Sequence, residues 1–118
     1  MSLDGLWVVE ALAVGGELVP PLRGTELTLE FLEDRVSGSA GVNRFMGVVT
    51  KDPMFGPLAI TLMAGSEDHM SQERIYLDHL SSVDSCEADT DDLRLIAEGL
   101  VVVVALKHPG TDGVSKTS

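Results

Sequence analysis

The stretch that most constrains the fold is residues 37–47, which read SGSAGVNRFMG. It sets three glycines and an asparagine between two segments of strand composition, residues 26–32 and 44–50. Glycine and asparagine supply the backbone conformations that a bulge or a sharp strand corner needs. We therefore expect Gly38 and Gly41 at a corner where a strand bends.

The residues beside these glycines have expected roles as well. Asn43 suits a left-handed or side-chain-bridged turn. We expect Phe45 to point to the core and Arg44 to pair with one of the many acidic residues. This assigns the stretch a structural role rather than contact with a ligand.

Alternation of apolar and polar residues is clearest in residues 26–32. It predicts a strand with Leu27, Leu29 and Phe31 buried and the intervening Glu26, Thr28 and Glu30 exposed. Composition and turn residues predict further strands at residues 6–12, 35–40, 44–50, 58–62, 83–88, 93–97 and 100–106.

Short connections join these segments. Glu33-Asp34 and Glu98-Gly99 fit tight hairpin turns, and we expect Leu18-Val19 to lie in a loop between Gly15-Gly16 and Pro20-Pro21. The run LVVVVAL at 100–106 is almost wholly apolar, which predicts a central strand buried on both faces.

One helix is expected, over about residues 67–81. Ser66 or Ser71 can cap its first turn, and acidic residues follow at 67 and 68, near the positive end of the helix dipole. The residues that recur at steps of three and four are Met70, Glu73, Tyr76, Leu77 and Leu80. The predicted class is α+β and mainly β: a partly open antiparallel β-barrel of about seven to eight strands, with this helix packed against it.

With 118 residues, the chain is expected to form one domain, residues 1–107, followed by a flexible tail at 108–118. Aromatic residues make up only 4%, so the one tryptophan, Trp7, is expected to be a packing anchor.

The formal net charge of −11 repels phosphate backbones, which argues against a nucleic-acid partner. No apolar stretch approaches the roughly 20 residues of a membrane helix. Cys86 is the one cysteine, which excludes an intramolecular disulfide. Together with the lack of a signal-like start, this favours the cytoplasm, or the envelope if a leader has been trimmed away. The oligomeric state is left open.

No pattern of residues indicates a catalytic, cofactor or metal site. His69 and His79 are ten residues apart on the predicted helix and point in different directions, so they cannot share one metal ion. The chain lacks the G-x-S-x-G elbow of hydrolases and the phosphate-binding loops. No basic residue adjoins Cys86 to lower its pKa. We therefore predict that the protein is not an enzyme and that a small hydrolytic activity is the weakest alternative.

The order of these features resembles the META domain family, which includes the bacterial heat-shock protein HslJ. The residues that carry the resemblance are Trp7, in the family's early strand, and the stretch 37–47, similar to the family signature "sG.aGCNrf.G". Within it lie Gly38, Gly41, Asn43, Arg44 and Gly47. LAITLMAG at 58–65 is similar to a second family pattern that ends in a cysteine. The resemblance implies an open β-barrel with a helix and, for some relatives, a place in the cell envelope.

This chain departs from the family pattern at two positions. Val42 and Gly65 stand where family members usually carry cysteines. If those cysteines form a disulfide in relatives, the loss of both is simpler than the loss of one, which would leave an unpaired thiol. The resemblance therefore implies no redox or disulfide role for this chain.

Two kinds of binding function remain open. One is a stress-related or envelope-related accessory domain that binds a protein or an apolar small molecule, the latter between helix and strands near Met63, Met70, Ile75 and Leu77. The other is a protein–protein module that uses an exposed strand edge.

Overall fold

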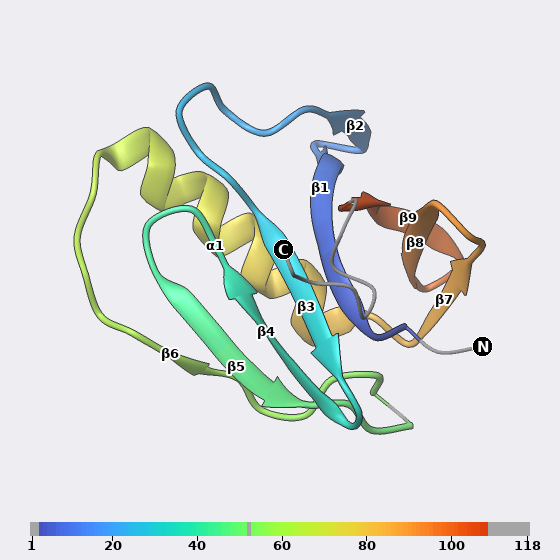
Figure 1. Ribbon diagram of the computed structural model, residues 1–118. Helices are drawn as coiled ribbons and strands as arrows, with labels where there is room; N and C mark the ends of the chain where they lie inside the picture. Colours follow the sequence, from blue (N-terminus) through green and yellow to red (C-terminus); the bar gives the residue numbers. More distant parts are fainter. Residues whose placement is uncertain (1–2, 52, 109–118) are drawn as a thin grey trace.

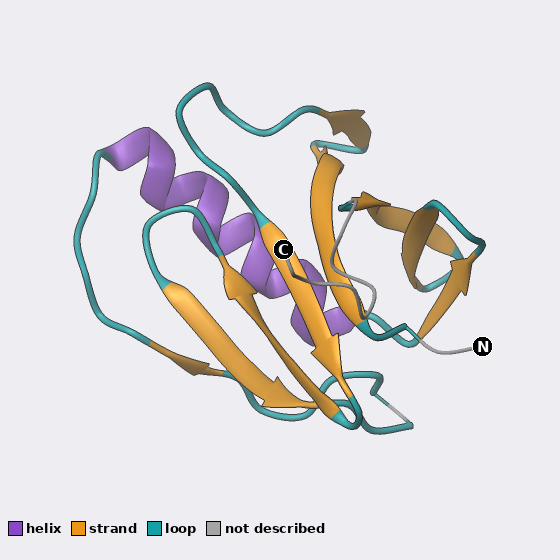
Figure 2. Ribbon diagram, viewed as in Figure 1, coloured by secondary structure: helices purple, strands orange, loops and turns teal. Residues whose placement is uncertain are grey.

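The computed structural model describes residues 3–51 and 53–108, where nine antiparallel strands and the helix α1 (Glu67–Ser82) form one layered unit (Figures 1 and 2). The α+β, mainly-β class and the open sheet are confirmed, with nine strands in place of seven to eight. The strands are β1 (Gly5–Val14), β2 (Glu17–Val19), β3 (Thr28–Leu32), β4 (Arg35–Ser39), β5 (Arg44–Val48), β6 (Ala59–Ile60), β7 (Ser85–Ala88), β8 (Asp92–Ala97) and β9 (Leu100–Lys107).

The strands follow the order β6-β5-β4-β3-β1-β9-β8-β7, and β2 pairs with the end of β1. The sheet is therefore open, with β6 at one end and β7 at the other. The register of β1 against β9 shifts between Val9 and Ala11, and that of β8 against β9 shifts between Leu95 and Ile96. Such bulges increase the local bend of a sheet, and the β7–β9 part curls away from β3–β5 (Figure 1).

Two-residue turns connect three of the hairpins. Glu33-Asp34 joins β3 to β4, and Glu98-Gly99 joins β8 to β9, as the sequence predicts. Glu33 and Glu98 adopt positive φ angles of 59° and 53°, which suits the tight turns of twisted hairpins. The third turn, Gly15-Gly16, joins β1 to β2, so Leu18 and Val19 lie in a strand and the expected loop is wrong there.

The core lies between α1 and the sheet. Trp7 and the alternating residues Leu27, Leu29 and Phe31 are all buried in it, and from the helix Tyr76 and Leu80 are fully buried. The Tyr76 hydroxyl donates a hydrogen bond of 2.8 Å to the Thr28 carbonyl, and its ring meets Phe45 edge to face.

Three expectations about exposure and length need correction. Thr28 is buried rather than exposed, because its hydroxyl accepts a hydrogen bond from the Ser39 N–H on β4. The run in β9 is central but not buried throughout, since Leu100 and Leu106 at its ends are exposed. The strand expected at 58–62 pairs with β5 only over Ala59–Ile60. The tail expected at 108–118 lies, apart from His108, outside the described residues.

In the described part of the chain, no helix is long and apolar enough to cross a membrane.

Candidate functional site

A buried glutamate of α1, Glu73, accepts hydrogen bonds from the connection between β4 and β5. Glu73 is only 4% exposed, and its carboxylate accepts three hydrogen bonds. The Val42 N–H and the Asn43 N–H donate to Oε1 at 2.9 and 2.6 Å, and the Asn43 side-chain Nδ2 donates to Oε2 at 2.6 Å. A buried charge is stable only when hydrogen bonds replace its water, and these donors meet that need.

The Asn43 side chain also makes hydrogen bonds to the residues that follow β6. Its Oδ1 accepts from the Met63 N–H at 2.6 Å and from the Thr61 hydroxyl at 2.9 Å, and its Nδ2 also donates to the Met63 carbonyl at 3.1 Å. The side-chain amide thus pairs with a peptide group as a neighbouring strand would. Arg44 continues the ladder, because its carbonyl accepts from the Thr61 N–H and its own N–H donates to the Thr61 hydroxyl.

The result is an extended edge segment, residues 58–63, whose outer side is open. The N–H groups of Thr61 and Met63 point inward. Because backbone directions alternate along a strand, the N–H and C=O groups of Leu58, Ile60 and Leu62 point toward the open side. The segment reads LAITLM and carries no charge. Leu62 is 96% exposed, and Met63 and Ile60 are exposed as well.

Grooves flank this edge segment on both faces of the sheet. On the helix side, a groove of about 350 Å³ runs beside α1, lined by Leu58, Ile60, Met70, Glu73, Arg74, Leu77, Asp78 and Ser81. On the face opposite α1, which we call the outer face, a groove of about 640 Å³ crosses β3–β6, lined in part by Leu32, Met46, Val48, Pro57 and Ala59.

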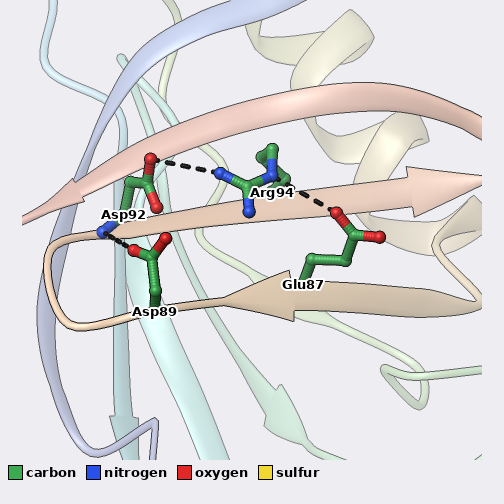
Figure 3. Close-up of polar contacts among 4 residues, drawn as sticks. All are labelled: Glu87, Asp89, Asp92 and Arg94. Carbon is green, nitrogen blue, oxygen red and sulfur yellow. Dashed lines mark hydrogen bonds and ion pairs between the residues drawn. The ribbon is translucent and has the colours of Figure 1, made fainter.

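The opposite edge of the sheet, β7, differs in charge. Glu87 lies within the strand, and Asp84 and Asp89 flank it. Arg94 of β8 lies between Glu87 and Asp92, at 3.4 and 3.1 Å (Figure 3). Charged side chains are a common protection of edge strands against pairing with another chain.

The acidic turn beside β7 also contains a carboxyl pair. A side-chain hydrogen bond between Asp89 and Asp92 lowers the pKa of Asp89 and raises the pKa of Asp92. Among the described residues, no group of three or more histidine, cysteine or acidic side chains is arranged to hold a metal ion. The turn is thus a charged surface in which Arg94 offsets part of the negative charge.

Of the family-motif residues, Asn43, Arg44 and Gly47 contact the edge segment, whereas Gly38 and Gly41 contact β3 and α1 or the chain before β3. Gly38 faces the Thr28 carbonyl so closely that a Cβ would collide with it, and Gly41 has a φ of +108°. Gly47 lets Leu58 approach β5, since a Cβ there would lie 2.8 Å from Leu58 Cδ2. Trp7 lies apart from this group, on β1, beneath the ammonium group of Lys107.

Arg44 does not behave as expected from sequence. Its side chain is exposed, and in the described ranges the ion pairs within 4 Å involve Arg94 instead. The hydrogen bonds that Arg44 makes to Thr61 come from its backbone.

Sequence reasoning did not assign roles to Glu73, Gln72 or Thr61. Gln72 is buried beside Glu73, accepts from the Leu22 N–H at 2.6 Å and donates to the Thr25 hydroxyl at 3.0 Å. A signal was present for Glu73, which shares the three- and four-residue spacing of the apolar residues of the predicted helix. Buried polar side chains at such positions need partners, and neighbouring loops supply them.

The two positions of the missing cysteines meet in space. A Cβ built on Gly65 would lie 3.6 Å from Val42 Cβ and 2.8 Å from Val42 Cγ2. The valine side chain therefore fills the space beside Gly65 and packs the chain that follows the edge segment against the β4–β5 connection.

The residues expected to line an interior ligand space do not gather in one cavity. Met70 and Leu77 line the open groove on the helix side, Ile75 packs against the core, and Met63 is exposed. Burial raises the pKa of the Cys86 thiol on β7, consistent with an unreactive cysteine.

Comparison with known protein families identifies one family for this chain. Residues 2–109 match the META domain. A solved structure described as the NMR structure of the protein from Burkholderia xenovorans superposes with a TM-score of 0.71 and 22% identity, covering 94% of this chain and 83% of that one. At this identity the likeness shows the fold alone. Among curated proteins, none matches the chain.

Proposed function

The chain belongs to the META domain family, and we propose that it is a protein-binding module that adds an extended segment of a partner to its sheet at β6. The observation that carries the proposal is the edge segment: six uncharged residues at one end of the sheet, exposed from Ala59 to Met63, with Leu58 half-buried against the core.

The contrast between the two edges supports a binding role. An unpaired edge is a template for another strand, and proteins usually place charges on it to prevent pairing. Here β7 carries Glu87 between two aspartates, whereas residues 58–63 carry no charge.

Rigidity of the edge segment favours binding as well. Association costs free energy whenever a flexible segment has to be ordered, so an edge held in place beforehand binds more tightly. The Asn43 side chain, itself bonded to Glu73, makes hydrogen bonds to Thr61 and Met63 and so fixes the second half of the segment.

The chemistry of the site specifies the partner segment. A strand beside β6 would hydrogen-bond to the outward groups of Leu58, Ile60 and Leu62, and alternate side chains would lie in the helix-side groove against Leu77 and Met70. The net charge of −11 attracts a basic partner over long range. The partner is therefore an extended, basic segment with apolar residues at alternate positions.

A synthetic peptide tests this proposal directly. The acetylated and amidated peptide Lys-Thr-Val-Thr-Leu-Thr-Val-Lys is titrated into ¹⁵N-labelled protein and followed by NMR. We expect a Kd of about 1 mM or lower, a binding free energy near −4 kcal/mol. The shifts should centre on residues 58–63, with slower exchange of the Ile60 and Leu62 amides.

Backbone methylation supplies the internal control. N-methylation of alternate peptide residues should abolish binding in one register and leave it intact in the other, because only every second N–H faces the edge. Leu62→Lys should weaken binding at least five-fold, whereas Leu100→Lys, at a 70% exposed leucine at the start of β9, should not.

Two results would overturn the proposal. One is binding that is insensitive to methylation in both registers, which would exclude strand addition. The other is concentration-dependent dimerisation through the same amides, which would assign the edge to a second copy of the chain.

A further inference from the structure

We infer that the same partner also covers the outer face of the sheet, with a second segment that is apolar and basic. This inference rests on the strand addition proposed above and extends it to a separate surface. The surface is the outer-face groove crossed by β3, β4 and β5.

The outer face presents large apolar side chains to solvent in register. Leu32 is 65% exposed and Met46 62%, and Val48 is exposed beside them. The strand pairing arranges these side chains in two rows across the sheet. One row runs through Leu32, Arg35 and Val48. The other runs through Ser37, Met46 and Ala59. The groove lined by these rows has a volume of about 640 Å³, which is larger than the 350 Å³ of the helix-side groove.

This patch is continuous with the edge segment. Ala59 belongs to β6 and lines the outer-face groove, together with Met46 of the next strand and Pro57. A strand added at β6 therefore lies directly beside the groove, and the chain that follows the strand can turn onto the outer face.

Interface size explains why a second contact is needed. Stable protein interfaces bury roughly 800 Å² on each partner. Six residues of edge span only about 20 Å, so one added strand is a small contact. The outer-face groove enlarges the interface without any rearrangement of the sheet.

Charge at the groove indicates what the second segment carries. Glu30 and Asp34 line it against one cation, Arg35, so its rim is net negative, as is the chain as a whole. Lysine or arginine side chains beside the apolar residues of the partner would meet this rim favourably.

The test compares the short peptide of the strand experiment with a longer one that continues it by Gly-Gly-Leu-Lys-Leu-Lys. We expect the Kd of the longer peptide to be at least ten-fold lower, with new amide shifts at Leu32, Met46 and Val48. Leu32→Lys removes the apolar contact and repels the basic segment, so it should remove this gain and leave the Kd of the short peptide unchanged. Leu100→Lys serves as the matched control and should alter neither.

The outcomes separate the two proposals. Equal Kd values for the two peptides, or a gain that survives Leu32→Lys, would overturn the outer-face contact and leave strand addition standing. Failure of the short peptide to bind the edge would overturn the proposed function, and this inference with it.

Discussion

Replacing the buried carboxylate that supports the edge segment is the sharpest test of its architecture. Glu73→Ala removes the acceptor of three hydrogen bonds. The buried Asn43 N–H then has no acceptor, whereas water can reach the half-buried Val42 N–H, and Asn43 Nδ2 keeps the Met63 carbonyl. A hydrogen bond to a charged group contributes about 1.5–3 kcal/mol, and an unsatisfied buried donor costs about 1–3 kcal/mol. We expect the free energy of unfolding to fall by about 3–4 kcal/mol, from a typical total of about 5–15 kcal/mol.

The assay is urea unfolding followed by the fluorescence of Trp7, which is buried in the folded chain. Asp78→Ala, at an exposed acidic position of the same helix, is the control and should stay within about 0.5 kcal/mol of the parent. Glu73→Gln keeps one acceptor oxygen but sets an amide donor against Asn43 Nδ2, so it should also destabilise. A loss below about 1 kcal/mol in Glu73→Ala, or a neutral Glu73→Gln, would refute the reasoning.

Three further predictions follow from close contacts and burial. The double variant V42C/G65C should form a disulfide, because the 3.6 Å between Val42 Cβ and a Cβ on Gly65 is within the normal range. Closing a loop of about 24 residues should raise the free energy of unfolding by about 3 kcal/mol relative to the reduced form, and equal melting temperatures with and without reductant would contradict this. Gly38→Ala should destabilise by at least about 2 kcal/mol in the same urea assay, because its Cβ collides with the Thr28 carbonyl; a neutral variant would mean that β3 and β4 move apart without cost. Since burial raises the pKa of the Cys86 thiol, iodoacetamide at pH 8.5 should alkylate the folded chain several-fold more slowly than the urea-unfolded chain, and the difference should shrink as pH rises; equal rates would show that the thiol is not shielded.

Elements with strong local signals were predictable from the sequence. The alternation of Leu27, Leu29 and Phe31 determined which face of β3 is buried, and the pair Glu98-Gly99 fixed the β8–β9 turn. The helix was predictable because its cap, acidic first turn and apolar spacing agree, and it begins at Glu67 as expected.

What escaped prediction depends on contacts between distant parts of the chain. β2 is three residues long and pairs with β1 through a Gly-Gly turn that reads equally well as a loop. The burial of Thr28 depends on Ser39, a partner 11 positions away. The candidate site is the extreme case, because Glu73 lies 30 residues from Asn43. A repeating pattern of apolar and polar residues cannot predict a hydrogen bond between side chains so far apart in the sequence.

The placement of β1 has a consequence for how the chain acquires its structure. β1 pairs on one side with β3 and on the other with β9, and Trp7 lies opposite Lys107, 100 positions later in the sequence (Figure 1). Loops this long close slowly compared with local hairpins, so β-rich topologies of this kind fold late and slowly. On the ribosome, the β3–β5 meander can form early, but β1 cannot gain its second neighbour until β9 has emerged from the exit tunnel. The nascent chain therefore carries a half-paired apolar strand through most of its synthesis, a period in which a chaperone would have reason to bind it.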